Sequence, residues 1–262
     1  MRLDDTLSAL GPDGSTGHRV ADVPVAQVVG TLDRPYDFDQ EFRLVNRHLR
    51  ERWQRLADAM ASGTEPPPVD LVQLGDLYFV ADGHHRVSVA RELGRRMVTA
   101  RVRWMGTIAF GMACLRAIHL ASKQAEREFL NRVPLPDRVR EDLWLDTPAD
   151  WMRLMDAARS WGLERALAGR APADPTDLAA AWWHEEVTPV LGRLRAAGFG
   201  HQVRDVELYA TALAARDRLG IPRWPSELTD SELTDSDLAS SDLAGSDLAD
   251  RPTRRGGVPS RR

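Results

Sequence analysis

The chain has 262 residues and a formal net charge of −4, with 43 % hydrophobic and 6 % aromatic residues, enough to bury one large core or two modest ones. No run approaches the roughly 18 apolar residues of a membrane span and the N-terminus lacks a signal-peptide pattern, which predicts a soluble, cytoplasmic protein. The single cysteine, Cys114, excludes an intrachain disulfide framework and a zinc site built from cysteines.

The charged residues are unevenly distributed along the chain. Residues 226–250 hold eight acidic and no basic side chains, while residues 251–262 hold five arginines. Residues 1–225 therefore carry a net charge close to −1. A nearly neutral body gives no support from bulk charge for nucleic-acid binding.

The first third of the chain predicts an arm, a strand and a helix. Residues 1–18 are rich in Gly, Ser, Asp and Thr, which predicts a flexible arm. The apolar pattern of residues 20–29 predicts a first strand. Apolar residues then recur at three- and four-residue steps from Phe38 to Met60, which predicts an amphipathic helix.

A compact α+β unit is predicted next, because a hairpin, a helix and a strand follow one another within a short stretch. The Gly75-Asp76 pair is a typical two-residue hairpin turn. The predicted elements are strands at 69–74 and 77–80, a helix at 84–93 and a strand at 97–104.

The pattern beyond Gly106 is helical. Proline and capping residues mark the helix boundaries, and Pro189 is expected to kink the third helix. The predicted helices lie at about 107–131, 147–161, 174–197 and 203–219.

Residues 223–262 contain five copies of a five-residue repeat, such as Ser226-Glu227-Leu228-Thr229-Asp230. Five copies are too few to bury a continuous repeat core, so a disordered, acidic, low-complexity tail is predicted. The expected domains are thus an arm at 1–18, an α+β domain at 19–105, an all-helical domain at 106–222 and this tail.

The segment Asp82-Gly83-His84-His85-Arg86 stands where a strand ends and a helix begins. The free amides and the positive dipole end of a helix N-terminus favour an anion. Gly83 would admit a phosphate, Arg86 and both histidines would donate to it, and Asp82 could cap the helix or help bind a metal–nucleotide. The alternative is an ordinary helix start with histidines that face solvent.

Here the sequence resembles the ParB/sulfiredoxin superfamily, whose signature Gly-x-x-Arg-x-x-x-Ala reads Gly83, Arg86 and Ala90. The resemblance covers about residues 19–104. It implies the α+β fold of that superfamily and a cradle for nucleotide phosphates, which is CTP in partition proteins, ATP in sulfiredoxins and ADP in free-serine kinases. Arg34 lies where partition proteins often place a functional arginine and is a further candidate ligand.

Two departures from that pattern narrow the expected activity. Sulfiredoxins need a cysteine where His84 stands, which excludes their chemistry, and partition proteins carry Glu-Arg where this chain has His84-His85. The variant is closer to the kinase branch, which uses an upstream carboxylate as its base. The candidate catalytic residues are Asp33, Asp37, Asp39 and Glu41, together with His85.

Residues 139–219 also resemble the helical region of uncharacterised actinobacterial ParB-like proteins, through the stretch Trp182-Trp183-His184-Glu185-Glu186-Val187. This likeness implies architecture only. Arg43, Arg47 and Arg50 would share one face of the first helix, either as a DNA or phosphate contact or, as we favour, as a solvated face.

The expected function is a ParB-like nucleotide-binding protein with a partition-like or regulatory role, which binds CTP, ATP or ADP with Mg²⁺ and needs no metal site of its own. The alternatives are a small-molecule phosphotransferase of the free-serine type and a non-catalytic interaction scaffold. DNA has little support as a partner, since no helix-turn-helix is evident. The sequence does not fix the oligomeric state, although the partition proteins that it resembles dimerise, so a homodimer is one expectation.

Overall fold

The computed structural model describes residues 1–34, 36–39, 41–200, 202–220 and 224, so the predicted repeats lie outside the described residues. The chain divides into two compact units, Met1–Arg127 and Glu128–Arg262, and each is described by itself. None of the helices in the described part combines the length and apolar character that crossing a membrane requires.

Five strands of the first unit form one mixed sheet with the order β1-β5-β3-β4-β2. β1 pairs antiparallel with β5, β5 parallel with β3, β3 antiparallel with β4, and β4 parallel with β2. The strands are β1 (Pro12–Pro24), β2 (Val28–Thr31), β3 (Val69–Leu74), β4 (Leu77–Asp82) and β5 (Met97–Thr107).

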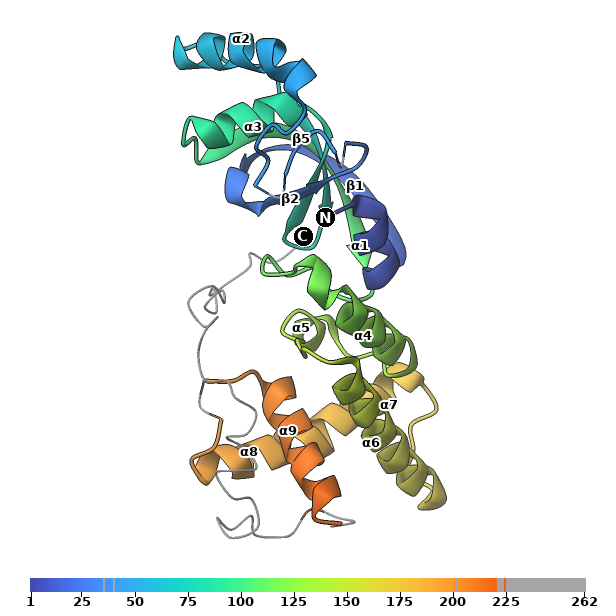
Figure 1. Cartoon of the computed structure of the whole chain (residues 1–262). Helices are drawn as coiled ribbons and strands as arrows, with labels where there is room; N and C mark the ends of the chain where they lie inside the picture. Colours follow the sequence, from blue (N-terminus) through green and yellow to red (C-terminus); the bar gives the residue numbers. More distant parts are fainter. Residues whose placement is uncertain (35, 40, 201, 221–223, 225–262) are drawn as a thin grey trace. The chain divides into compact units, whose positions relative to one another are not determined.

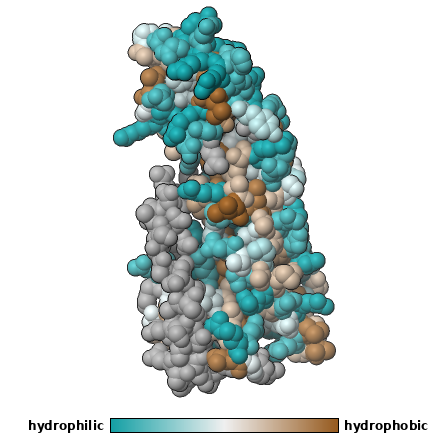
Figure 2. All heavy atoms as spheres, viewed as in Figure 1, coloured by the Kyte–Doolittle hydropathy of each residue, from teal (hydrophilic) through white to brown (hydrophobic). Residues whose placement is uncertain are grey.

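Helical segments precede, connect or follow these strands along the chain. α2 lies beside α3 (Figure 1), and in the view of Figure 2 the surface over α2 is largely hydrophilic. The helical segments are α1 (Leu3–Leu10), η1 (Val25–Gln27), η2 (Arg47–Leu49), α2 (Arg50–Ala61), α3 (His84–Glu92), η3 (Ala117–His119) and the start of α4 (Leu120–Arg132).

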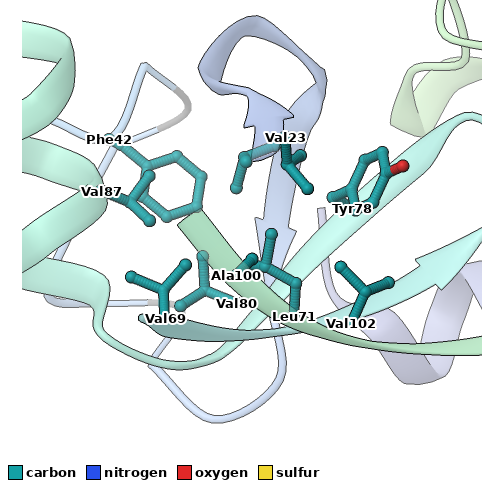
Figure 3. Close-up of a cluster of buried hydrophobic side chains, with 10 residues drawn as sticks. Val23, Phe42, Val69, Leu71, Tyr78, Val80, Val87, Ala100 and Val102 are labelled. Carbon is teal, nitrogen blue, oxygen red and sulfur yellow. The ribbon is translucent and has the colours of Figure 1, made fainter. Parts of the chain in front are cut away.

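The main core of the first unit lies between the sheet and α3. Figure 3 shows Phe42 beside Val87 of α3, with side chains of the sheet converging on them. The other buried members of this cluster are Val23, Val28, Val69, Leu71, Tyr78, Val80, Ala100 and Val102. Burial of these apolar side chains fixes the position of α3 on the sheet.

A second cluster joins α2 to α3 and to the chain before β2. It contains Ala57 and Met60 of α2, Val89 and Ala90 of α3, and Val25. The indole N–H of Trp53 adds a hydrogen bond of 2.9 Å to the Ser88 hydroxyl. α2 is therefore held against α3 both by apolar packing and by a directional polar contact.

The prediction of a flexible arm at residues 1–18 is wrong. Leu3 and Leu10 of α1 are buried. β1 pairs with β5 from its first residue, Pro12, opposite Thr107, to its last residue, Pro24, opposite Met97. This strand could not be predicted from its own residues, which are rich in Gly and Ser, because its pairing partner lies about 80 residues further along the sequence. The strand predicted at 20–29 is in fact divided between β1 and β2 by η1.

The helix predicted from Phe38 to Met60 begins later than expected, with η2 and then α2. Phe42 has a φ of +60°, a left-handed conformation that an α-helix does not contain. Phe38 and Phe42 are buried, but from a loop. Arg43 lies in this loop and Arg47 in η2, so the prediction that they share a helix face with Arg50 is wrong.

The second unit is helical, as expected, and its core is aromatic. Trp182 lies edge-on to Phe129 and Tyr209, with ring centroids 6.3 and 6.0 Å apart, and Trp151 is fully buried. The helices are α5 (Asp137–Arg140), α6 (Pro148–Leu167), α7 (Pro175–Trp182), η4 (Trp183–Val187), α8 (Thr188–Ala196) and α9 (Asp205–Arg218).

Four details of this part of the chain differ from the sequence-based expectation. The helix predicted at 107–131 begins at Leu120, after η3, and the irregularity expected at Pro189 is a π-helical turn, η4, just before it. Trp224, inside the predicted tail, packs on Tyr209 with ring centroids 5.9 Å apart. The first unit extends to Arg127, beyond the predicted boundary at residue 105.

Candidate functional site

Gly83 makes the turn between β4 and α3. Its φ of +95° and ψ of +25° are left-handed, a conformation that glycine adopts without penalty. A Cβ atom there would lie 2.7 Å from Val69 Cγ1 and 2.9 Å from Arg86 Nε. No side chain caps α3, so the first amides of the helix are available to an anion.

A cavity of about 450 Å³ opens at this helix N-terminus, and we call it the α3 cavity. Its size is within the range of small-molecule sites. Its wall combines residues 82–86 with Arg34, Arg52 of α2 and Pro67. The structure thus brings together all six residues that the sequence proposed as phosphate ligands: Arg34, Asp82, Gly83, His84, His85 and Arg86.

A second cavity of about 390 Å³, the β2 cavity, is lined by Asp5 and Asp39 among other residues. Its wall includes Arg34 and His84, which also line the α3 cavity. The two cavities are therefore neighbours that share two side chains.

His84 is buried, with 5 % of its surface exposed, and its Nε2 lies 2.5 Å from the hydroxyl of Thr31. That hydroxyl oxygen also accepts the Arg34 amide at 3.1 Å, so its hydrogen is free to be donated to Nε2. Burial, and secondarily the Arg34 charge, lowers the pKa of His84 to about 4. His84 is therefore neutral near pH 7.

His85 lies edge-on to Phe38, with ring centroids 5.4 Å apart, and the His84 ring stacks on Phe38 with ring centroids 6.0 Å apart. Both ring nitrogens of His85 are buried without a hydrogen-bond partner. Burial, then the charges of Arg52 and Arg34, lower its pKa. An unsatisfied polar side chain at a cavity wall is typical of a ligand-binding position.

The guanidinium of Arg86 is engaged within the protein. Nη1 donates to the carbonyl oxygens of Pro67 at 2.9 Å and Pro68 at 2.7 Å, and Nη2 donates to the Asp82 carboxylate. The Arg86 side chain is 16 % exposed, whereas the Asp82 side chain is 66 % exposed. Arg86 thus joins the strand end to the proline-rich wall of the α3 cavity.

Arg34 is half exposed and forms an ion pair of 3.3 Å with Asp37. The Asp37 carboxylate also accepts a hydrogen bond of 2.8 Å from the side-chain amide of Asn46. The backbone carbonyl oxygen of Asp37 accepts the backbone N–H of Val45. Asp37 therefore organises the loop before α2.

Of the predicted catalytic carboxylates, Asp39 alone lines the β2 cavity, and none lines the α3 cavity. One Asp39 oxygen accepts the Arg43 amide at 2.7 Å. Asp33 and Glu41 are exposed and line neither cavity. The described residues contain no group of three or more His, Cys, Asp or Glu side chains placed to hold a metal ion.

Arg52 lines the α3 cavity, although the sequence places it beside the arginines of the first predicted helix, which we favoured as a solvated face, and not among the phosphate ligands. It occupies the first turn of α2, which the α2–α3 packing places over the α3 cavity. Its sequence neighbours Arg50 and Arg55 are also arginines, so no local pattern distinguishes it.

No protein-family model matches the sequence, and no curated protein matches it. Among solved structures, sulfiredoxin from Arabidopsis thaliana matches with 17 % identity over 34 % of this chain and 88 % of its own, at a TM-score of 0.27. The C-terminally truncated chromosome-partitioning protein ParB from Caulobacter crescentus, complexed with CTP-γ-S, matches with 16 % identity. The match covers 62 % of this chain and 97 % of that protein's chain, at a TM-score of 0.26.

A pNOB8-like ParB N-domain matches with 12 % identity over 83 % of this chain and 82 % of its own, at a TM-score of 0.24. The matched structures are of the ParB and sulfiredoxin kinds, to which the sequence bears a resemblance. At these identities and TM-scores it says nothing about ligands, so the assignment of a ligand rests on the residues of this chain.

Proposed function

We propose that this protein is a ParB-like nucleotide-binding protein that takes the phosphates of CTP, ATP or ADP in the α3 cavity, with a partition-like or regulatory role. The observation that carries the proposal is the combination of an uncapped helix N-terminus with basic side chains around one cavity. Helix amides and guanidinium groups are the donors that phosphate oxygens prefer. The two unpaired nitrogens of His85 at the same wall support the presence of a polar ligand.

Isothermal titration of the full chain with CTP, ATP and ADP, each with Mg²⁺, tests this proposal. We expect one site per chain for at least one of these nucleotides, and much weaker binding of the matching nucleoside, because the cavity donors face phosphate oxygens. Failure of all three nucleotides to bind would refute the proposal.

A second candidate function is phosphoryl transfer to a small hydroxyl compound, and the position of Asp39 favours it. The β2 cavity that Asp39 lines shares Arg34 and His84 with the α3 cavity. An acceptor bound there would lose its hydroxyl proton to the Asp39 carboxylate as its oxygen attacks the terminal phosphorus. The bond from that phosphorus to the nucleotide would break, releasing the shortened nucleotide.

Replacing Asp39 with asparagine is expected to lower acceptor-dependent nucleotide turnover by about a hundredfold, the usual contribution of a general base, and to leave nucleotide affinity near wild type. Serine and amino alcohols are the first acceptors to assay. Asp33→Asn is the matched control, since Asp33 lines neither cavity. Nucleotide binding without any acceptor-dependent turnover would reject this second function.

Mg²⁺ would enter with the phosphates, as this ion usually does, and Asp82 and Glu65 are the carboxylates among the described residues that line the α3 cavity. The homodimer, the DNA contact and the interaction scaffold are predictions that gel filtration, DNA titration and affinity capture on the helical unit would test.

A further inference from the structure

We infer that Arg52 supplies the guanidinium contact to the ligand phosphate, and that Arg86 is a positioning residue. This assignment rests on the proposed nucleotide binding in the α3 cavity. It departs from the sequence motif, which designates Arg86 as the phosphate ligand. The reason lies in how the hydrogen-bond donors of Arg86 and Arg52 are used.

Both terminal nitrogens of Arg86 bond to the protein. Nη1 donates to the carbonyl oxygens of Pro67 and Pro68, and Nη2 donates to Asp82. If Arg86 turned to a phosphate, it would leave two carbonyl groups and a carboxylate without their partner, each with an unfavourable free energy. The charge of Arg86 is moreover already balanced by Asp82.

Arg52 has the opposite character. Its side chain is exposed, it lines the α3 cavity, and no hydrogen bond or ion pair joins it to another residue of the described part of the chain. Its charge acts on the cavity wall, since it contributes to the lowered pKa of His85. A guanidinium group without a carboxylate partner is available for a phosphate at no loss of existing bonds.

The position of Arg52 is fixed by its neighbour in sequence. Trp53 donates to Ser88 of α3, and Ala57 and Met60 pack against Val89 and Ala90. The backbone that carries Arg52 is therefore tied to the helix whose N-terminus would bind the phosphate. A positioned charge loses less entropy on binding than a mobile one.

Charge balance around the cavity leads to the same assignment. Glu65 is paired with Arg95 and Asp82 with Arg86, while Arg34 shares its charge with Asp37 at 3.3 Å. Among the described residues that line the α3 cavity, the positive charge that is left over is that of Arg52. It is the charge that an anionic ligand would neutralise.

The test compares Arg52→Ala with Arg55→Ala by nucleotide titration at several salt concentrations. Arg55 lies on the same helix, is exposed, and does not line the α3 cavity. We expect Arg52→Ala to weaken nucleotide affinity by about tenfold or more and to flatten its salt dependence, with an unchanged melting temperature. Arg55→Ala should behave as wild type, and Arg52→Lys, which keeps the charge, should recover most of the affinity.

Arg86→Ala should instead lower the melting temperature and weaken binding without flattening the salt dependence. The assignment is overturned if Arg52→Ala binds as Arg55→Ala does, or if Arg86→Ala flattens the salt dependence at an unchanged melting temperature. A wild-type protein that binds no nucleotide refutes the proposed function itself. The failure of the assignment and that of the function are thus distinguishable.

Discussion

Replacing Gly83 with alanine is expected to destabilise the first unit by about 3 kcal/mol and to abolish nucleotide binding. The left-handed backbone alone costs an alanine about 1–2 kcal/mol. The new methyl group would also lie 2.7 Å from Val69 Cγ1 and 2.9 Å from Arg86 Nε, which forces the core or the Arg86 bonds to shift. Hydrogen exchange of β3 and β4 amides measures the stability, and titration measures the binding.

Gly94, just after α3, provides the matched control for this prediction. It is left-handed too, with φ +65°, but no atom lies within 4 Å of the Cβ position. Gly94→Ala should therefore show only the backbone penalty of about 1–2 kcal/mol and keep nucleotide binding. Equal losses of stability in the two variants would mean that the contacts with Val69 and Arg86 do not matter.

As the pH falls from about 6.5 to about 4, the protonation equilibrium of His84 by itself is expected to destabilise the first unit by about 3 kcal/mol. The folded-state pKa of His84 is about 4, against 6.5 when unfolded. In this pH range the unfolded chain takes up a proton on His84 that the folded chain does not. The stabilisation is thus complete above pH 6.5 and is lost progressively toward pH 4.

His84→Gln isolates this contribution, because a glutamine amide can still accept the Thr31 hydrogen bond but does not titrate. The difference in pH dependence between wild type and variant removes the effect of the carboxylates, including Asp76, whose pKa is raised by burial. Hydrogen exchange in β4 at matched pH values measures it. Parallel pH profiles for the two proteins would show that His84 is protonated as easily in the folded state as in the unfolded one.

The hairpin and helix at the centre of the site could be predicted from the sequence because their signals are local. The turn at Gly75-Asp76 and the break at Asp82-Gly83 both occur where they were expected, and α3 begins at His84. Turn residues and a change of apolar periodicity act within a few residues. The ligand candidates between Asp82 and Arg86 follow from that local structure.

Phe38 and Phe42 show where a periodic pattern misleads. Their spacing fits a helix, but Phe42 adopts φ +60° and packs into the sheet core, where Arg91 lies 5.1 Å from its ring centroid. Phe38 contacts both histidines of the site. These are tertiary contacts, and burial in a loop produces the same apolar residues as burial on a helix face.

The arginines of the site show a different limit. The motif selects Arg86 through its spacing from Gly83, but spacing does not reveal that Pro67, Pro68 and Asp82 already occupy its donors. Arg52 carries no motif, and it reaches the α3 cavity because Trp53 and Met60 pack α2 against α3. The partners of a charged side chain are set by the fold.

The pairing of β1 with β5 governs the order in which the first unit can form. β1 is the earliest strand in the chain, yet its hydrogen-bonding partner is β5, the last strand of the sheet to be synthesised. On the ribosome, the segment Pro12–Pro24 must stay unpaired until β5 has emerged, whereas the β3–β4 hairpin can form as soon as its own residues are available. Distant pairings of this kind slow folding and leave strand edges exposed during synthesis, so the first unit is expected to depend more than the helical unit on chaperones at high translation rates.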